Sequence, residues 1–162
     1  MTPRIPGIDL SGTGSCGSFN LRRTARAVTS FFDLAFQDCG IRSTQFTILV
    51  GIAKTQPTPI SALADLLAID RTTLTRSLRL LKKEALLTVS DRSTKRQRFL
   101  KLTSKGERLL KSSLPAWRKA QHRFVEALGS EKWTHLRAEL EWLARLAISL
   151  EHTQQIQDNN SP

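Results

Sequence analysis

Hydrophobic residues recur at helical spacing over most of the chain, which predicts a mainly α-helical fold. The first helix should extend from about residue 19 and end by Gly40, because its apolar residues share one face. The members of that face are Leu21, Ala25, Val28, Phe32 and Ala35. A second, more buried helix is expected over 44–54, and the prolines within Gln56–Pro59 should end it.

Two short helices separated by a three-residue turn are expected next. Ser61 and Asp70 are their expected N-caps, and the second helix should end near Glu84. At 100° per residue its inward residues fall within a sector of about 60° and must face the core. These residues are Leu74, Leu78, Leu81 and Ala85. The opposite side carries only hydroxyls and cations, namely Thr72, Thr75, Arg76, Arg79 and Lys83.

The hydrophobic period then changes from helical to alternating. Leu87 and Val89 alternate with polar residues, and Leu100 and Leu102 alternate with Phe99 and Lys101. Residues 91–97 between them are polar and basic. This pattern predicts a small β-hairpin with a basic tip. Two short helices followed by such a hairpin form a winged helix-turn-helix.

Two long helices complete the pattern. Ser104 and Glu107 form an expected capping box at the start of the first, which Pro115 should kink and Gly129 should end. The last helix should extend from the cap Ser130 to about residue 151. Its apolar residues step by three and four, as in a coiled-coil seam. The seam consists of Trp133, Leu136, Leu140, Leu143, Ala147 and Leu150.

The seam can pack inside one chain or against a second chain. The first helix and the kinked helix also present apolar faces that a small winged domain does not cover, so a dimer built from both chain ends is favoured. The expected organisation is a flexible arm over 1–18, helical dimerisation segments over 19–40 and 103–152, a winged helix-turn-helix over 41–102, and a flexible tail over 153–162.

Positive charge is concentrated around the predicted winged unit. The 162 residues include 25 Lys and Arg against 14 Asp and Glu, a net charge of +11. Residues 71–108 hold twelve of these cations and three of these acids. A solvated basic surface is the plain interpretation, but clustered cations favour a polyanionic partner, of which nucleic acid is the commonest.

The helix after Asp70 is the expected DNA-reading helix, lying in the major groove of a duplex. Arginine can bind guanine through two hydrogen bonds, and threonine can contact the thymine methyl group or a phosphate. The residues expected nearest the bases are Arg71, Thr72, Thr73, Thr75 and Arg76, with Arg79, Lys82 and Lys83 nearer phosphates. The hairpin residues expected at the minor groove or its phosphates are Arg92, Lys95, Arg96 and Arg98.

Three stretches of this unit resemble the multiple-antibiotic-resistance regulator (MarR) family of transcription factors. They are 60–67, 70–76 and 100–106, and 20–23 and 42–46 also fit the N-terminal helices of that family. The resemblance covers about 16–152. It implies a homodimeric winged-helix repressor or activator that reads a pseudo-palindromic operator, with DNA binding tuned by a small ligand or an oxidant. A repressor is favoured.

Two hypotheses address what such a regulator senses. A small aromatic or phenolic acid could bind between aromatic side chains and N-terminal arginines, although these aromatics can equally be plain core. The residues concerned are Phe19, Phe32, Phe46 and Trp117, with Arg22, Arg23 and Arg26 for a carboxylate. Alternatively, Cys16 near three arginines could act as a redox-sensitive thiolate, the plain alternative being an ordinary cysteine on an arm.

Several other classes are not favoured. The sequence has no GxSxG, GxxxxGK[ST], HExxH or GxGxxG motif, so neither an enzyme nor a cofactor is expected. Its three histidines are isolated, so no metal site is predicted, although His122 or His135 could be half of an inter-subunit site. Two cysteines and no long apolar stretch favour a reducing cytoplasm without membrane contact. A nucleic-acid-binding protein without sequence preference and a protein-interaction adaptor are the alternative functions.

Overall fold

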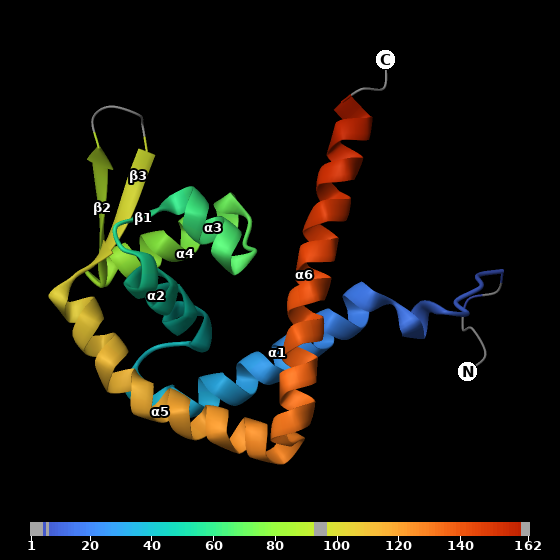
Figure 1. Cartoon of the computed structure of the whole chain (residues 1–162), viewed down its shortest axis with the longest axis horizontal. Helices are drawn as coiled ribbons and strands as arrows, with labels where there is room; N and C mark the ends of the chain where they lie inside the picture. Colours follow the sequence, from blue (N-terminus) through green and yellow to red (C-terminus); the bar gives the residue numbers. More distant parts are fainter. Residues whose placement is uncertain (1–4, 6, 93–96, 160–162) are drawn as a thin grey trace.

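The computed structural model describes residues 5, 7–92 and 97–159, and it has two parts (Figure 1). A lobe combines α2 (Ser43–Thr55), α3 (Ile60–Leu67) and α4 (Arg71–Lys83) with a small antiparallel sheet, and a helical frame combines α1 (Gly17–Ala35), α5 (Ser104–Leu128) and α6 (Ser130–Asn159). Two 3-10 turns, Thr13–Ser15 and Gln37–Cys39, flank α1. The predicted fold class, mainly helical with a β-hairpin in a winged helix-turn-helix, is confirmed. Within the described part of the chain, no helix is long and apolar enough to cross a membrane.

The predicted hairpin is present and has a third strand beside it. Strands β2 (Leu87–Arg92) and β3 (Gln97–Leu102) pair antiparallel, with Leu87 opposite Leu102. Strand β1 (Thr58–Pro59) pairs with the other side of β3, giving the order β1-β3-β2. The sequence predicted only a chain break there, because two residues are too few to show alternation. The side-chain Oε1 of Gln56 accepts a hydrogen bond from the backbone N of Leu102 at 3.0 Å, which holds this edge.

The core of the lobe lies where its three helices meet the sheet. Fully buried side chains come from every helix and strand of the lobe, among them Leu49, Ile52, Thr58, Leu63, Leu74, Leu81, Leu87 and Leu100. The sector of α4 predicted to face inward is therefore confirmed for its three leucines, since Leu78 is also buried. The prediction for Ala85 is wrong: α4 ends at Lys83, and Ala85 is exposed in the turn that follows, with a φ of 57°. Burial of each leucine contributes about 1.5–3 kcal/mol relative to exposure, so this face determines which side of α4 is buried.

The N-caps of the helices agree only in part with the predicted ones. Asp70 caps α4 as predicted, accepting a hydrogen bond from the backbone N of Thr73 at 2.8 Å. The other three predicted caps are wrong by one or two residues. Helix α3 follows Pro59 without a side-chain cap, α5 is capped by Thr103 rather than Ser104, and Ser130 is the first residue of α6 rather than its cap. Where two hydroxyl residues are adjacent, as at 103 and 104, sequence rules cannot choose between them.

A carboxylate of α1 holds the start of α2. Asp33 Oδ1 accepts hydrogen bonds from both the backbone N and the Oγ of Ser43, each at 2.7 Å. The free N–H groups at a helix N-terminus favour a carboxylate acceptor. The frame and the lobe are therefore joined by a polar contact as well as by packing.

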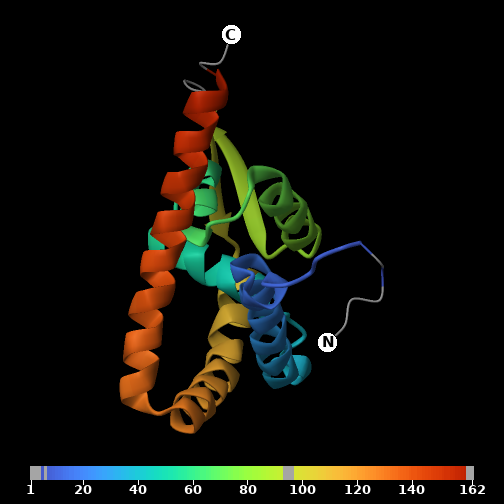
Figure 2. The same ribbon diagram turned by 90° about the vertical axis from the view of Figure 1, so that its right-hand side faces the viewer.

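The last of the two long helices departs from prediction at its C-terminal end. Helix α5 continues through Pro115 and is curved (Figure 1). Helix α6 extends to Asn159, so the tail predicted from residue 153 is helical over 153–159. Figure 2 shows α5 and α6 diverging from a sharp turn at Gly129, whose φ is 91°. Of the α6 side chains that the structure describes, none is buried.

Candidate nucleic-acid interface

The polar side of α4 faces outward along its whole length. Leucines Leu74, Leu78 and Leu81 anchor the opposite side at exposures of 4% or less. The exposed residues on α4 include all its cations and two threonines: Arg71, Thr72, Thr73, Arg76, Arg79, Lys82 and Lys83. Thr75 is half-buried. We call the outward set of Arg71, Thr72, Thr75, Arg76 and Arg79 the basic face.

The basic face is continuous, and its cations form no ion pair within the described residues. Its five residues together line a surface hollow of about 310 Å³. The Thr75 hydroxyl donates to the carbonyl oxygen of Arg71 at 2.6 Å. No arginine or lysine of α4 forms an ion pair with any residue that the structure describes. An unpaired row of guanidinium groups beside hydroxyls can bind phosphates and base edges.

The N-terminal end of α4 is well ordered by its cap. Hydrogen bonds from the Thr73 side chain and backbone lower the pKa of the Asp70 carboxyl below its usual value. The carboxylate is therefore charged at neutral pH and complements the positive end of the helix dipole. This places Arg71 and Thr72 at a fixed helix start rather than on a frayed end.

The hairpin beside the basic face is described only in part. Arg98 lies on β3 and is exposed, and the backbone of Arg92 pairs with that of Gln97. Lys95 and Arg96 lie outside the described residues. The DNA contacts expected of these four side chains stay predictions.

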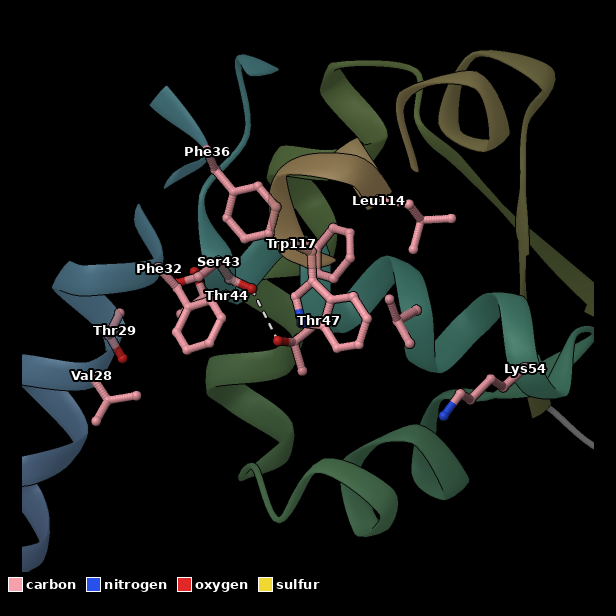
Figure 3. Close-up of a pocket in the computed structure, with 12 residues that line it drawn as sticks. Val28, Thr29, Phe32, Phe36, Ser43, Thr44, Thr47, Lys54, Leu114 and Trp117 are labelled. Carbon is pink, nitrogen blue, oxygen red and sulfur yellow. Dashed lines mark hydrogen bonds between the residues drawn. The ribbon is translucent and has the colours of Figure 1, made fainter. Parts of the chain in front are cut away.

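A second candidate site is an apolar pocket of about 500 Å³ between α1, α2 and α5 (Figure 3). Its aromatic wall is formed by Phe32, Phe36, Phe46 and Trp117. The rings of Phe46 and Trp117 are stacked with centroids 6.3 Å apart, and those of Phe36 and Phe46 are 4.7 Å apart. Ser43, Thr44, Thr47 and Lys54 supply polar groups, and Lys54 stands at one end of the pocket in Figure 3.

The structure brings together three of the seven residues predicted for ligand binding. Phe32, Phe46 and Trp117 line the pocket, whereas Phe19 and the three α1 arginines, Arg22, Arg23 and Arg26, are exposed earlier on α1 and do not line it. Sequence reasoning missed Lys54. The signal was available, because Phe46, Val50 and Lys54 follow one another at i, i+4 and i+8 on one face of α2.

Cys16 and the histidines form no composite site in the described residues. Cys16 is exposed at the N-cap of α1, and the other cysteine, Cys39, is half-buried. His122 Nδ1 lies 3.7 Å from Glu126 Oε2, and His135 Nε2 lies 4.0 Å from Glu131 Oε1. Both pairs are on exposed helix surfaces. No cluster of three or more metal-ligating side chains occurs in this part of the chain. The redox role of Cys16 stays a prediction.

The sheet, the helix pair and the outward basic face define a winged helix-turn-helix protein. The chain is similar to the transcriptional regulator MosR of M. tuberculosis, solved in complex with DNA, at 30% identity and a TM-score of 0.77; the match covers 83% of this chain and 98% of MosR. The chain belongs to the MarR family of transcriptional regulators. No protein-family model and no curated protein matches the sequence.

Two more distant structures share the fold. A MarR-family regulator from Rhodococcus sp. RHA1 is 18% identical with a TM-score of 0.69, and the match covers 84% of this chain and 96% of that one. The transcriptional repressor CouR of Rhodococcus jostii, bound to a 23-mer DNA duplex, is 20% identical with a TM-score of 0.72 and coverages of 85% and 98%. CouR has also been solved with p-coumaroyl-CoA.

Proposed function

We propose that this protein is a homodimeric, sequence-specific DNA-binding repressor that reads a pseudo-palindromic operator and is released by a small aromatic acid. The observation that carries the DNA-binding part is the basic face, in which a leucine-anchored helix holds three arginines and two threonines outward. Within the described residues these arginines form no ion pair. A helix of this kind fits the major groove, whose base edges arginine and threonine can read.

The direct test is selection of duplexes from a random pool by the purified protein, followed by footprinting. We expect two inverted half-sites about one helical turn apart, which is roughly 34–36 Å. The alternative function is winged-helix nucleic-acid binding without sequence preference. Under this alternative, the selection enriches no sequence, and random duplex competes as well as any selected duplex. The affinity then depends on salt concentration and not on sequence.

Replacing Arg76 by alanine should weaken operator binding by about 1–3 kcal/mol and relax the preference at one base position. Arg76 lies within the N-terminal half of α4, in the middle of the basic face. Titrations with operator and random duplex measure the effect. The matched variant is Arg79→Ala, for which we expect equal losses on both duplexes and a salt slope smaller by about 1. Equal losses on both duplexes for Arg76→Ala would contradict its base-reading role.

The dimeric part of the proposal rests on α6. Three leucines of its seam are exposed in the single chain: Leu136 38%, Leu140 42% and Leu150 62%. Apolar exposure of this extent marks an interaction surface, and a period of 3.5 residues suits a second helix. We propose that 19–40 and 103–152 form the dimer, with 41–102 as the DNA-binding unit.

The ligand part rests on the pocket of Figure 3. Its volume of about 500 Å³ is within the range of small-molecule sites, and its aromatic wall with one cation suits a planar acid. The pocket lies between α1 and α5 of the frame and α2 of the lobe, so an occupant can alter their relative position. CouR, which has this fold, is bound to p-coumaroyl-CoA in a solved structure.

A phenolic acid that occupies the pocket should raise the melting temperature, by an amount that corresponds to about 2.7 kcal/mol at a ligand concentration of 100 Kd. Lys54→Met should lower affinity for the acid about tenfold or more, because it removes a charge-assisted partner. A thermal-shift series measures both effects. The control is the uncharged amide of the same phenolic acid, which should bind the unaltered protein and Lys54→Met equally. An equal loss of acid and amide affinity would remove Lys54 from carboxylate recognition.

A further inference from the structure

The C-terminal end of α4 is held by the first turn of α5 through three successive carbonyl groups. These belong to Glu84, Ala85 and Leu86, which follow the last turn of α4. Lys105 Nζ donates to the Glu84 oxygen at 2.8 Å. Thr103 donates twice, from Oγ1 to the Ala85 oxygen at 2.7 Å and from N to the Leu86 oxygen at 3.1 Å.

The same contact leaves no space between the two helices. A Cβ atom built on Gly106 would overlap the carbonyl oxygen of Leu86, so only glycine permits this approach. The Thr103 hydroxyl also accepts a hydrogen bond from the backbone N of Gly106 at 3.1 Å, as the N-cap of α5. One hydroxyl therefore starts α5 and fastens the end of α4. We call Thr103, Lys105 and Gly106 the clamp.

The clamp satisfies the carbonyl of Glu84, the C-cap of α4, and those of the two residues that follow it. The carbonyls of the last turn itself accept from backbone N–H groups of 84–86, and a cation near this end of the helix is favourable. The chain reverses at Ala85, whose φ is 57°, so the carbonyls after α4 leave the helical direction. The side-chain bonds of Thr103 and Lys105 fix the angle between α4 and α5, and the Thr103 N bond to Leu86 extends the β2–β3 pairing beside them. The buried leucines of α4 mainly hold the helix against the lobe.

The clamp joins the two parts of the molecule that the proposed function requires to move together. Helix α5 carries Trp117 of the pocket and leads through Gly129 to α6 (Figure 1). Helix α4 has 13 residues and is about 20 Å long, with the clamp at one end and Arg71 at the other. A tilt of about 10° at the clamp displaces the Arg71 end by roughly 3 Å, the scale of one hydrogen bond.

We propose that the clamp is the positioning element that sets the angle of α4 to α5, and through it the separation of the two recognition helices in the dimer. Thr103 and Lys105 are positioning residues: they act on DNA through α4 and need not touch it. This inference rests on the proposed function, since a separation exists only in a DNA-reading dimer. Its consequence is that the clamp determines which half-site spacing the protein accepts.

The test compares half-site spacing between variants of the full chain. Thr103→Val removes the hydroxyl and keeps the shape, and Thr103→Ser restores the hydroxyl. Lys105→Met removes the ammonium group, and Lys111→Met removes an equal charge from an exposed position on the same helix. Each protein is titrated with the selected operator, with operators lengthened or shortened by one base pair, and with a single half-site, at a temperature where all variants are folded.

Thr103→Val and Lys105→Met should bind the operator about tenfold more weakly, because the second half-site is engaged at a lower effective concentration. Half-site affinity should stay within about twofold, and the penalty for altered spacing should shrink. Thr103→Ser and Lys111→Met should behave as the unaltered protein.

An unchanged spacing penalty in Thr103→Val would overturn the inference. So would equal losses on half-site and operator, which would mean that the clamp supports α4 only within one lobe. A salt slope reduced by about 1 in Lys105→Met would make Lys105 a phosphate contact and remove it from the clamp's role. If the unaltered protein itself shows no spacing preference, the proposed function fails, and this inference fails with it.

Discussion

Replacing Leu140 and Leu143 together by glutamate should convert the protein to a monomer and lower its affinity for a two-half-site operator by roughly 10²–10⁴-fold. Both residues belong to the α6 seam, and Leu140 is 42% exposed in the single chain. Buried in a dimer seam, carboxylates would lose hydration without gaining partners. Monomers lose the advantage of a second half-site tethered to the first.

Sedimentation and titration with operator and single half-site measure this effect. The matched control replaces Trp142 and Ile148 together by glutamate, which adds the same two charges to exposed apolar residues of α6 outside the seam. We expect this control to remain dimeric and the half-site affinity of the seam variant to be unchanged. A seam variant that remains a dimer would exclude the seam as the interface. A monomer with full operator affinity would exclude the two-half-site mode of binding.

Leu74→Ala should lower the free energy of unfolding by about 2–5 kcal/mol, the usual cost of a cavity at a fully buried leucine. Leu74 is 0% exposed and packs on the inner side of α4, directly behind the basic face. Its loss removes part of the anchor that holds the arginines outward. Urea unfolding of the variant measures the change, with the midpoint and the slope analysed separately.

Leu80→Ala is the matched control for the same helix. Leu80 is 49% exposed, so the same truncation should cost less than about 1 kcal/mol. Equal losses of unfolding free energy in the two variants would mean that α4 is not held to the lobe mainly by its inner face. A loss at Leu74 without any effect on DNA affinity of the folded protein would show that the basic face keeps its position by other contacts.

The orientation of α4 could be read from the sequence because it depends on a period of 3.6 residues within one helix. Leucines every three or four residues specify which side is buried, and the arginines then have only the opposite side. The cap at Asp70 is likewise local, since a carboxylate can reach the N–H groups of the next turn. The hairpin was recognisable from alternation over four residues on each strand.

Other features could not be read because their partners are distant in the sequence. Asp33 caps a helix that begins ten residues later, and β1 exists only because β3 offers it an edge. Spacing alone places Lys54 on one face of α2 with Phe46, but only the approach of Trp117 of α5 makes that face the wall of a pocket. The aromatic and basic residues near Phe19 and Arg22 suggested a ligand site, but both lie on the first turns of α1 and do not line the pocket.

The sequence alone determined the winged helix-turn-helix, the outward basic face and the apolar seam of α6, because each follows from spacing within a single element. Only the tertiary structure decided the pocket, the cap of α2 and the clamp between Thr103, Lys105 and the end of α4. These features consist of short directional contacts between elements. Such contacts depend on where helices meet in space, and no pattern along the chain specifies that position.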